Sequence, residues 1–172
     1  MKHSKIALIV LTITGLFFFF SAPASPQLLD TQKKDQPEIL AVRVIPPAKA
    51  VSPGETLELT LELNITPGYH INAQKPEDEL LIPTSVEFKE LPVVEVKEII
   101  FPPAVKKKFK FSEKMLSVYE GQIKVKVRLK LADDFCGSSL ELPGQVRYQA
   151  CNNEACLRPM SLPFKVNLKV IS

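Results

Sequence analysis

The residues of this chain best placed to do chemistry are two cysteines, Cys151 and Cys156, separated by four residues. The alternating pattern of residues 146–150 predicts a strand that runs directly into the first cysteine. Asn152 and Asn153 follow, and asparagine favours turns because it tolerates left-handed conformations and hydrogen-bonds to its own main chain. Such a turn can bring Cys156 back to the Cα separation of roughly 4.4–6.8 Å that a disulfide needs. The pair can therefore exist as a disulfide or as a dithiol.

Two uses of the pair are open on its spacing alone. A static disulfide would staple the hairpin, the common fate of close cysteines in exported domains. A redox-active disulfide would instead be opened by a partner thiolate through a mixed disulfide. The short loop favours the second use, because small exposed rings tend to be strained and more reducible. A staple across so few residues would also stabilise the fold little, since the entropic gain grows with loop length.

The other reactive side chains offer less. Cys136 is the odd cysteine, and we expect a buried or loop residue, with a resolving or intermolecular thiol as the alternative. His70 is the one histidine beyond residue 24, and with the cysteines it could in principle bind zinc or copper. The cysteine spacing lacks the paired arrangement typical of such sites, so we expect no metal and no other cofactor. A single histidine also leaves hydrolytic chemistry little to work with.

The N-terminus indicates the compartment. Lys2 and Lys5 precede an apolar run over residues 6–20, and residues 21–24 (Ser-Ala-Pro-Ala) offer the small-x-small pattern of a signal-peptidase site. The run is short for a membrane span, which needs ~20 apolar residues, although a retained N-terminal anchor is the alternative. We therefore expect residues 1–24 to be a signal peptide that directs export, with cleavage near Ala24. Exported proteins meet oxidising conditions, in which a close cysteine pair starts out bridged.

Beyond the signal segment, the chain is long enough for one domain. About 148 of the 172 residues would remain, enough for a proper core. Residues 25–38 are polar and charged, the composition of a flexible leader, so we assign the folded domain to residues 39–172. The whole chain carries 22 basic and 19 acidic residues. This nearly neutral balance argues against a nucleic-acid binder, which would normally show a concentrated basic surface.

Period-two alternation predicts that the domain is all-β. Apolar and polar residues alternate over residues 57–63, 123–131 and 162–170, as in half-buried antiparallel strands. No useful amphipathic helix is found, and Pro and Gly divide the chain at intervals of roughly ten residues, which predicts a β-sandwich. Residues 104–114 differ, because they contain five lysines and no core-like run. We interpret this basic segment as a solvated loop or an edge strand, since lysines blunt sheet edges.

Three strings of residues together resemble a known family. Tyr148-Gln149-Ala150-Cys151 and, four residues on, Cys156-Leu157-Arg158-Pro159 closely resemble the active-site hairpin of the N-terminal periplasmic domain of the DsbD thiol:disulfide interchange proteins. The segment 68–76 (Gly-Tyr-His-Ile-Asn-Ala-Gln-Lys-Pro), followed by Leu-Ile-Pro-Thr at 81–84, is similar to the family's other signature. The segment 116–121 (Leu-Ser-Val-Tyr-Glu-Gly) also fits the family. The resemblance extends from about residue 39 to residue 170.

The resemblance implies an immunoglobulin-like β-sandwich that acts as a thiol-disulfide oxidoreductase in the periplasm. Cys151 and Cys156 would be the redox pair, and by analogy Cys156 would bond to the partner. The domain would take electrons from a thioredoxin-like domain fed by a membrane-embedded reductase. It would pass them to periplasmic reductases, isomerases or cytochrome c maturation factors. A loop aromatic shields the disulfide in the family, and here that role would fall first to Phe111 and second to Phe109 in the basic segment.

This sequence departs from the family pattern in two places. Arg158 stands where the family often has the first proline of a Pro-Pro pair. The membrane-spanning and thioredoxin-like regions of full-length relatives do not occur in this chain, so we expect a stand-alone form that borrows its reductant. The alternative to the electron relay is an immunoglobulin-like binding or structural module with a static disulfide.

Overall fold

The computed structural model describes residues 38–171. The predicted signal peptide, 1–24, and all but the last residue of the predicted leader, 25–38, lie outside the described residues. Within residues 38–171 no helix has the length and apolar character needed to cross a membrane.

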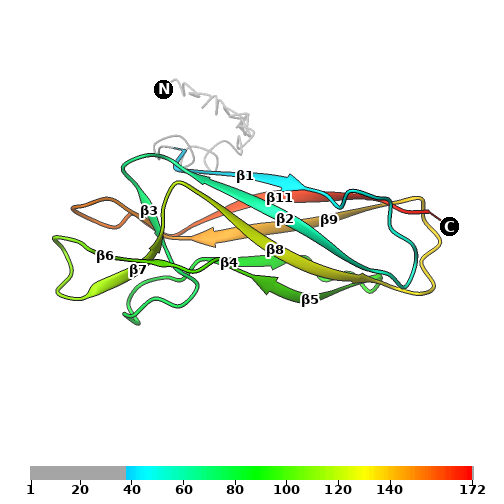
Figure 1. Cartoon of the computed structure of the whole chain (residues 1–172), viewed down its shortest axis with the longest axis horizontal. Coiled ribbons are helices and arrows are strands. Elements are labelled where there is room, and N and C mark those ends of the chain that lie inside the picture. The colour runs from blue at the N-terminus through cyan, green and yellow to red at the C-terminus, as the bar shows by residue number, and fades with distance from the viewer. Residues whose placement is uncertain (1–37, 172) are drawn as a thin grey trace, which may run out of the picture. The chain divides into compact units, whose positions relative to one another are not determined.

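The described residues form eleven strands in three sheets (Figure 1). The first sheet has the order β1-β2-β8-β5, the second β10-β3-β7-β6, and the third β11-β9-β4. Their bounds are β1 Leu40–Ile45, β2 Thr56–Ile65, β3 His70–Asn72, β4 Ser85–Phe88, β5 Val94–Ile100, β6 Val105–Lys108, β7 Met115–Tyr119, β8 Gln122–Leu131, β9 Ser139–Tyr148, β10 Ala150–Cys151 and β11 Met160–Lys169. All pairs of named strands are antiparallel. The predicted all-β antiparallel sandwich is confirmed.

The alternating strands bury one face each. In β2, β8 and β11 every second side chain enters the core, while the residues between them stay largely in solvent. The buried members include Leu59, Leu61, Val127, Leu129 and Val166, all at most 2% exposed. Complete burial of such a side chain contributes about 1.5–3 kcal/mol relative to leaving it in water. These strands therefore form the rigid frame of the domain.

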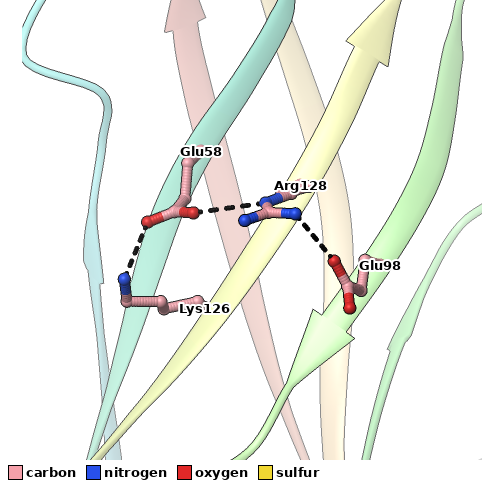
Figure 2. A network of polar contacts seen from close by, with 4 residues as sticks. All are labelled: Glu58, Glu98, Lys126 and Arg128. Atoms are coloured by element: carbon pink, nitrogen blue, oxygen red, sulfur yellow. Dashed lines mark hydrogen bonds and ion pairs between the residues drawn. The ribbon is translucent and has the colours of Figure 1, made fainter.

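The outer face of β2, β8 and β5 carries a chain of ion pairs (Figure 2). Arg128 on β8 lies opposite Glu58 on β2 and Glu98 on β5 in the strand register. Its guanidinium donates to both carboxylates, at 3.4 and 3.0 Å, and Lys126 pairs with Glu58 at 3.2 Å. The outward residues of β8 at 124, 126, 128 and 130 are all basic, and acidic residues of β2 and β5 face them. Exposed ion pairs contribute little to stability, so the network aligns opposite charges across the three strands without adding much to the free energy of folding.

Pro143 and Gly144 lie inside β9, although these residue types more often mark turns. The glycine is required by packing, because a Cβ at Gly144 would lie 2.6 Å from the ring of Phe164 and 2.9 Å from the carbonyl oxygen of Glu87. Strands β11 and β4 both pair with β9 at this point. The close approach lets β9 continue unbroken to the cysteine hairpin.

The short strands of the second sheet assemble one end of the sandwich. β10 contains Cys151, β3 pairs with it, and β7 and β6 continue the sheet outward to a free edge. A small apolar cluster of Phe109, Leu116 and Val118, with Leu81 against it, lies under the β6–β7 hairpin. Figure 1 shows this hairpin and the loop that follows β9 at the same end of the sandwich. The predicted edge strand in the basic segment is confirmed as β6.

Candidate functional site

Cys151 and Cys156 form a disulfide with an S–S distance of 2.03 Å. The two residues face each other as an isolated antiparallel bridge, with their Cα atoms 3.9 Å apart, which is closer than the separation expected from the sequence. Cys151 is fully buried, whereas Cys156 is half-buried. Cys156 is therefore the cysteine that presents surface to an incoming protein, whereas Cys151 presents none.

A turn centred on Asn152 closes the four-residue loop between the two cysteines. Its side-chain oxygen accepts hydrogen bonds from the backbone amides of Glu154 and Ala155, at 2.8 and 2.9 Å. Its own amide donates to the carbonyl of Ala155 at 3.0 Å. This is the self-bonded asparagine turn that the sequence predicts. The turn, together with the hydrogen bond of 2.8 Å that the Leu157 amide donates to the carbonyl of Ala150, holds Cys156 opposite Cys151.

Gln149 ties the hairpin to two other segments. Its side-chain oxygen accepts hydrogen bonds from the Asn72 side-chain amide and from the Ile82 backbone amide, both at 3.1 Å. Its side-chain nitrogen donates to the carbonyl of Leu157 at 3.1 Å, just beyond the second cysteine. The three bonds join β3, the segment before β4 and both arms of the hairpin. Gln149 therefore positions the disulfide relative to its surroundings.

Asn72 extends this network into β3. Its side-chain amide also donates to the carbonyl of Ile82 at 3.0 Å, and its own carbonyl accepts from the Thr84 hydroxyl at 2.5 Å. Both Asn72 and Thr84 are fully buried. Buried polar groups that are bonded in this way favour one arrangement of the backbone. The segment between β3 and β4 is thereby fixed beside the cysteine hairpin.

Glu77 anchors the same segment from the other side. Its carboxylate accepts hydrogen bonds from the backbone amide of Ser117, at 2.7 Å, and from the Ser117 hydroxyl. The Ser117 hydroxyl and amide hold the pKa of the Glu77 carboxyl below its usual range, and Lys106 acts in the same direction. The segment from β3 to β4 is thus attached to β7 as well as to the hairpin.

His70 is the residue that faces Cys151 across the β3–β10 pair. It is 2% exposed, and its Nε2 atom has no hydrogen-bond partner among residues 38–171. Burial lowers the pKa of the imidazole to about 4, against an opposing effect of Glu120 and with a smaller contribution from Lys107. The ring is therefore neutral at physiological pH, which suits its apolar surroundings.

Of the two candidate shielding residues, Phe109 is the one in contact with the site. Its ring stacks on the imidazole of His70 with centroids 3.9 Å apart, and it is 4% exposed. Phe111 stacks on the far side of Phe109, at 5.5 Å, and is 37% exposed. The order of the rings outward from Cys151 is therefore His70, Phe109 and Phe111. The structure favours Phe109 over the first-ranked Phe111 as the inner ring.

Cys136 is a free cysteine in the loop between β8 and β9. It is exposed, so the expectation of a loop residue is right and that of a buried one is wrong. Its sulfur lies 3.3 Å from the carbonyl of Asp134. The ten residues of β9, about 30 Å of extended chain, separate this loop from the cysteine hairpin. Cys136 is therefore too distant to resolve a mixed disulfide on Cys156 of the same chain.

No group of three or more His, Cys, Asp or Glu side chains gathers in a metal-binding arrangement within residues 38–171. Asn72 and Gln149 received no role from the sequence, and His70 was considered only as a metal ligand. All three fall inside two of the strings that resemble the DsbD domains. Their presence in those strings was the available signal, but their partners become visible only in the folded chain.

The fold and the site together define a class of protein: an antiparallel β-sandwich that carries one half-accessible disulfide on a hairpin at its end. Residues 37–168 match the family described as "Thiol:disulfide interchange protein DsbD, N-terminal", and the chain belongs to this family. Family membership and the Cys151–Cys156 disulfide together support thiol-disulfide interchange. Comparison with curated protein sequences finds no match.

Several solved structures are similar. The N-terminal periplasmic domain of ScsB from Proteus mirabilis has 16% identity and a TM-score of 0.51, over 78% of this chain and 47% of that chain. The reduced DsbD N-terminal domain of Neisseria meningitidis has 15% identity and a TM-score of 0.44, over 74% of this chain and 85% of that chain. A complex of the DsbD and PilB N-terminal domains from the same organism has 14% identity and a TM-score of 0.42, over 71% and 80%. The predicted immunoglobulin-like fold is confirmed.

Proposed function

We propose that the chain is a periplasmic thiol:disulfide interchange domain that relays reducing equivalents through Cys151 and Cys156. Its donor would be a thioredoxin-like domain or a membrane thiol reductase, and its acceptors would be periplasmic thiol-disulfide proteins. The observation that carries the proposal is the disulfide itself, which joins a fully buried cysteine, Cys151, to a partly exposed one, Cys156. The signal-type N-terminus supports export to the compartment where such partners work.

The unequal burial of the two cysteines gives them different roles. A donor thiolate attacks the sulfur of Cys156, the bond to Cys151 breaks, and Cys151 leaves as a thiolate. A second donor thiol then displaces Cys156, so that the donor becomes a disulfide and the pair gains two electrons and two protons. In the second half of the cycle, the Cys156 thiolate attacks an acceptor disulfide. Cys151 then displaces the reduced acceptor and restores the internal bond.

Phe109 is the proposed shield of the pair. It covers His70, which lies directly beside Cys151, and it is itself covered by Phe111. A small thiol approaching from this side meets two stacked rings before it reaches the disulfide. The exposed side of Cys156 remains open, so a partner that fits the hairpin can react while an unselective thiol reacts more slowly.

Single-cysteine variants test the assignment of roles. Both are made in a Cys136→Ser background, because the exposed thiol of Cys136 would otherwise react with the probe. The probe is a thioredoxin with one active-site cysteine, activated as a mixed disulfide with thionitrobenzoate. We expect the Cys151→Ser variant, which keeps Cys156, to form the covalent adduct at least about tenfold faster than Cys156→Ser, because thiol exchange depends on access. Equal rates, or no adduct from either variant, would contradict the proposal.

A further inference from the structure

The β6–β7 hairpin concentrates positive charge. Five lysines fall between residues 106 and 114, against the single acid Glu113. Lys106 pairs with Glu77 at 3.6 Å and Lys107 with Glu120 at 2.6 Å, so these two are neutralised locally. The other three, Lys108, Lys110 and Lys114, form no ion pair with a carboxylate of residues 38–171, and all three are exposed. The hairpin therefore keeps a net positive charge in a domain that is nearly balanced as a whole, with 18 basic and 17 acidic residues over residues 38–171.

This charge lies at the same end of the sandwich as the disulfide, with β3 and β7 between β6 and β10 in the sheet. Phe109 comes between the lysines in sequence, and its ring stacks on His70, the residue paired with Cys151. Lys107 also places its ammonium 5.9 Å from the centre of the Phe109 ring. Figure 1 shows the hairpin at the same end of the sandwich as the cysteine loop. A partner protein that covers this end of the sandwich to reach Cys156 therefore also faces these lysines.

The hairpin also exposes apolar surface among the lysines. Phe111 is 37% exposed and Met115 is 52% exposed. A hollow of about 400 Å³ opens between this hairpin and the segment before β4. It is lined by Leu81, Phe111 and Leu116, together with the polar residues Asp78, Ser112, Glu113 and Lys114. Apolar contacts at the centre and charges at the rim are the usual anatomy of a protein interface.

Protection of a sheet edge explains only part of the lysine cluster. Lys106, Lys107 and Lys108 lie on β6, the outer strand of its sheet, where lysines prevent pairing with other chains. Lys110 and Lys114 follow the end of β6 and lie in the turn before β7, where there is no strand edge to protect. Lys108 is held by a hydrogen bond to the Glu113 carbonyl. Lys110 and Lys114 are thus the cations most available to a partner.

We infer that this hairpin is the docking surface for a partner protein whose redox thiols are bordered by acidic residues. The inference rests on the proposed interchange function and names the kind of partner. Opposite charges around the two reactive sites raise the rate of encounter and orient the partner, so that its thiol meets Cys156. We favour a protein over an anionic membrane as the partner for two reasons. The lysines lie at the same end of the sandwich as the disulfide, and the aromatic ring of Phe109 in the hairpin is buried, so it is not available for insertion into a membrane.

Two synthetic dithiol peptides test the inference. Each contains Cys-Gly-Pro-Cys, flanked on both sides by three glutamates in one peptide and by three lysines in the other. Their intrinsic reactivities are normalised against the neutral disulfide 4,4′-dithiodipyridine. At low salt we expect the glutamate peptide to reduce the Cys151–Cys156 disulfide at least about tenfold faster than the lysine peptide. At about 0.5 M NaCl the difference should shrink to within about twofold, because salt screens exposed charges.

Charge-reversal variants locate the effect. Lys110→Glu combined with Lys114→Glu should abolish or reverse the preference, whereas Lys49→Glu combined with Lys169→Glu should preserve it. The control pair is also exposed and changes the net charge equally. Both control residues lie at the end of the sandwich away from the disulfide. Lys169 is the last residue of β11, and the first residue of that strand, nine positions earlier, pairs with Tyr148 near the cysteines. Lys49 lies two residues before Val51, which forms a bridge with Val170.

Equal rates for the two peptides at low salt would overturn the inference and leave the interchange function intact. Lysine-dependent binding to phosphatidylglycerol vesicles, together with equal peptide rates, would assign the hairpin to a membrane and also overturn it. Failure of both peptides and of uncharged dithiothreitol to open the disulfide would instead refute the proposed function itself.

Discussion

Replacement of Gln149 by alanine tests how the disulfide is held in place. The change removes three hydrogen bonds, from Asn72 and Ile82 and to Leu157, each 3.1 Å long. A hydrogen bond contributes about 0.5–1.5 kcal/mol net, which gives about 1.5–4.5 kcal/mol for three. Gln149 is half-buried, so water can replace part of the loss. We therefore expect a loss of about 2 kcal/mol, or about 5–8 °C in Tm for a domain of this size.

Gln145, on β9 and four residues before Gln149, supplies the matched control. It donates one exposed hydrogen bond, of 2.8 Å, to Glu87, so Gln145→Ala should change the free energy of unfolding by no more than about 0.5 kcal/mol. The measurements are urea denaturation and amide hydrogen exchange of the oxidised protein. The Ile82 amide loses its acceptor only in Gln149→Ala, so its exchange should accelerate in that variant alone. If both variants unfold at the same urea concentration and the Ile82 amide stays protected in both, Gln149 does not hold the hairpin.

Two further predictions concern the stacked rings. Phe109→Ala should destabilise the domain by about 3 kcal/mol, because the side chain is buried, and should speed reduction of the disulfide by dithiothreitol. Phe111→Ala should have both effects to a much smaller extent. Equal effects of the two variants would contradict the assignment of Phe109 as the inner ring. The second prediction concerns His70, whose pKa is about 4 in the folded protein and near 6.5 in the unfolded chain. As the pH falls, the unfolded chain therefore binds a proton at His70 before the folded protein does. The free energy of unfolding should accordingly decrease as the pH falls from about 6.5 towards 4. After allowance for solvent screening the loss is about 2 kcal/mol. Urea titrations between pH 7 and pH 5, above the range of the carboxylates, should show this slope in the wild type and not in His70→Phe.

The strands and the cysteine turn could be predicted because local patterns determine them. Alternation over residues 57–63 required one buried face, and β2 has it. Asn152 forms its turn from its own side chain and neighbouring amides, so the tight return to Cys156 was visible in the sequence. The five lysines of residues 104–114 predict a solvated loop or an edge strand, because lysines blunt sheet edges, and residues 105–108 form the outer strand β6.

The interactions around the disulfide could not be predicted in this way, because they join distant segments. Gln149 bonds to residues 72, 82 and 157, which only the pairing of β10 with β3 brings together. The choice between Phe109 and Phe111 depends on a turn, where alternation no longer assigns faces. The stacking of Phe109 on His70 depends on both features. Residue types and spacing thus located the reactive pair but not the side chains that position and cover it.

The reduction potential of the Cys151–Cys156 pair tests the central claim most directly. The oxidised protein is equilibrated with glutathione buffers of graded ratio, and the reduced fraction is measured from the mass added on alkylation. An interchange domain predicts a midpoint between about −180 and −270 mV, the range of proteins that exchange disulfides with partners. A midpoint below about −300 mV would identify a structural staple and contradict the account.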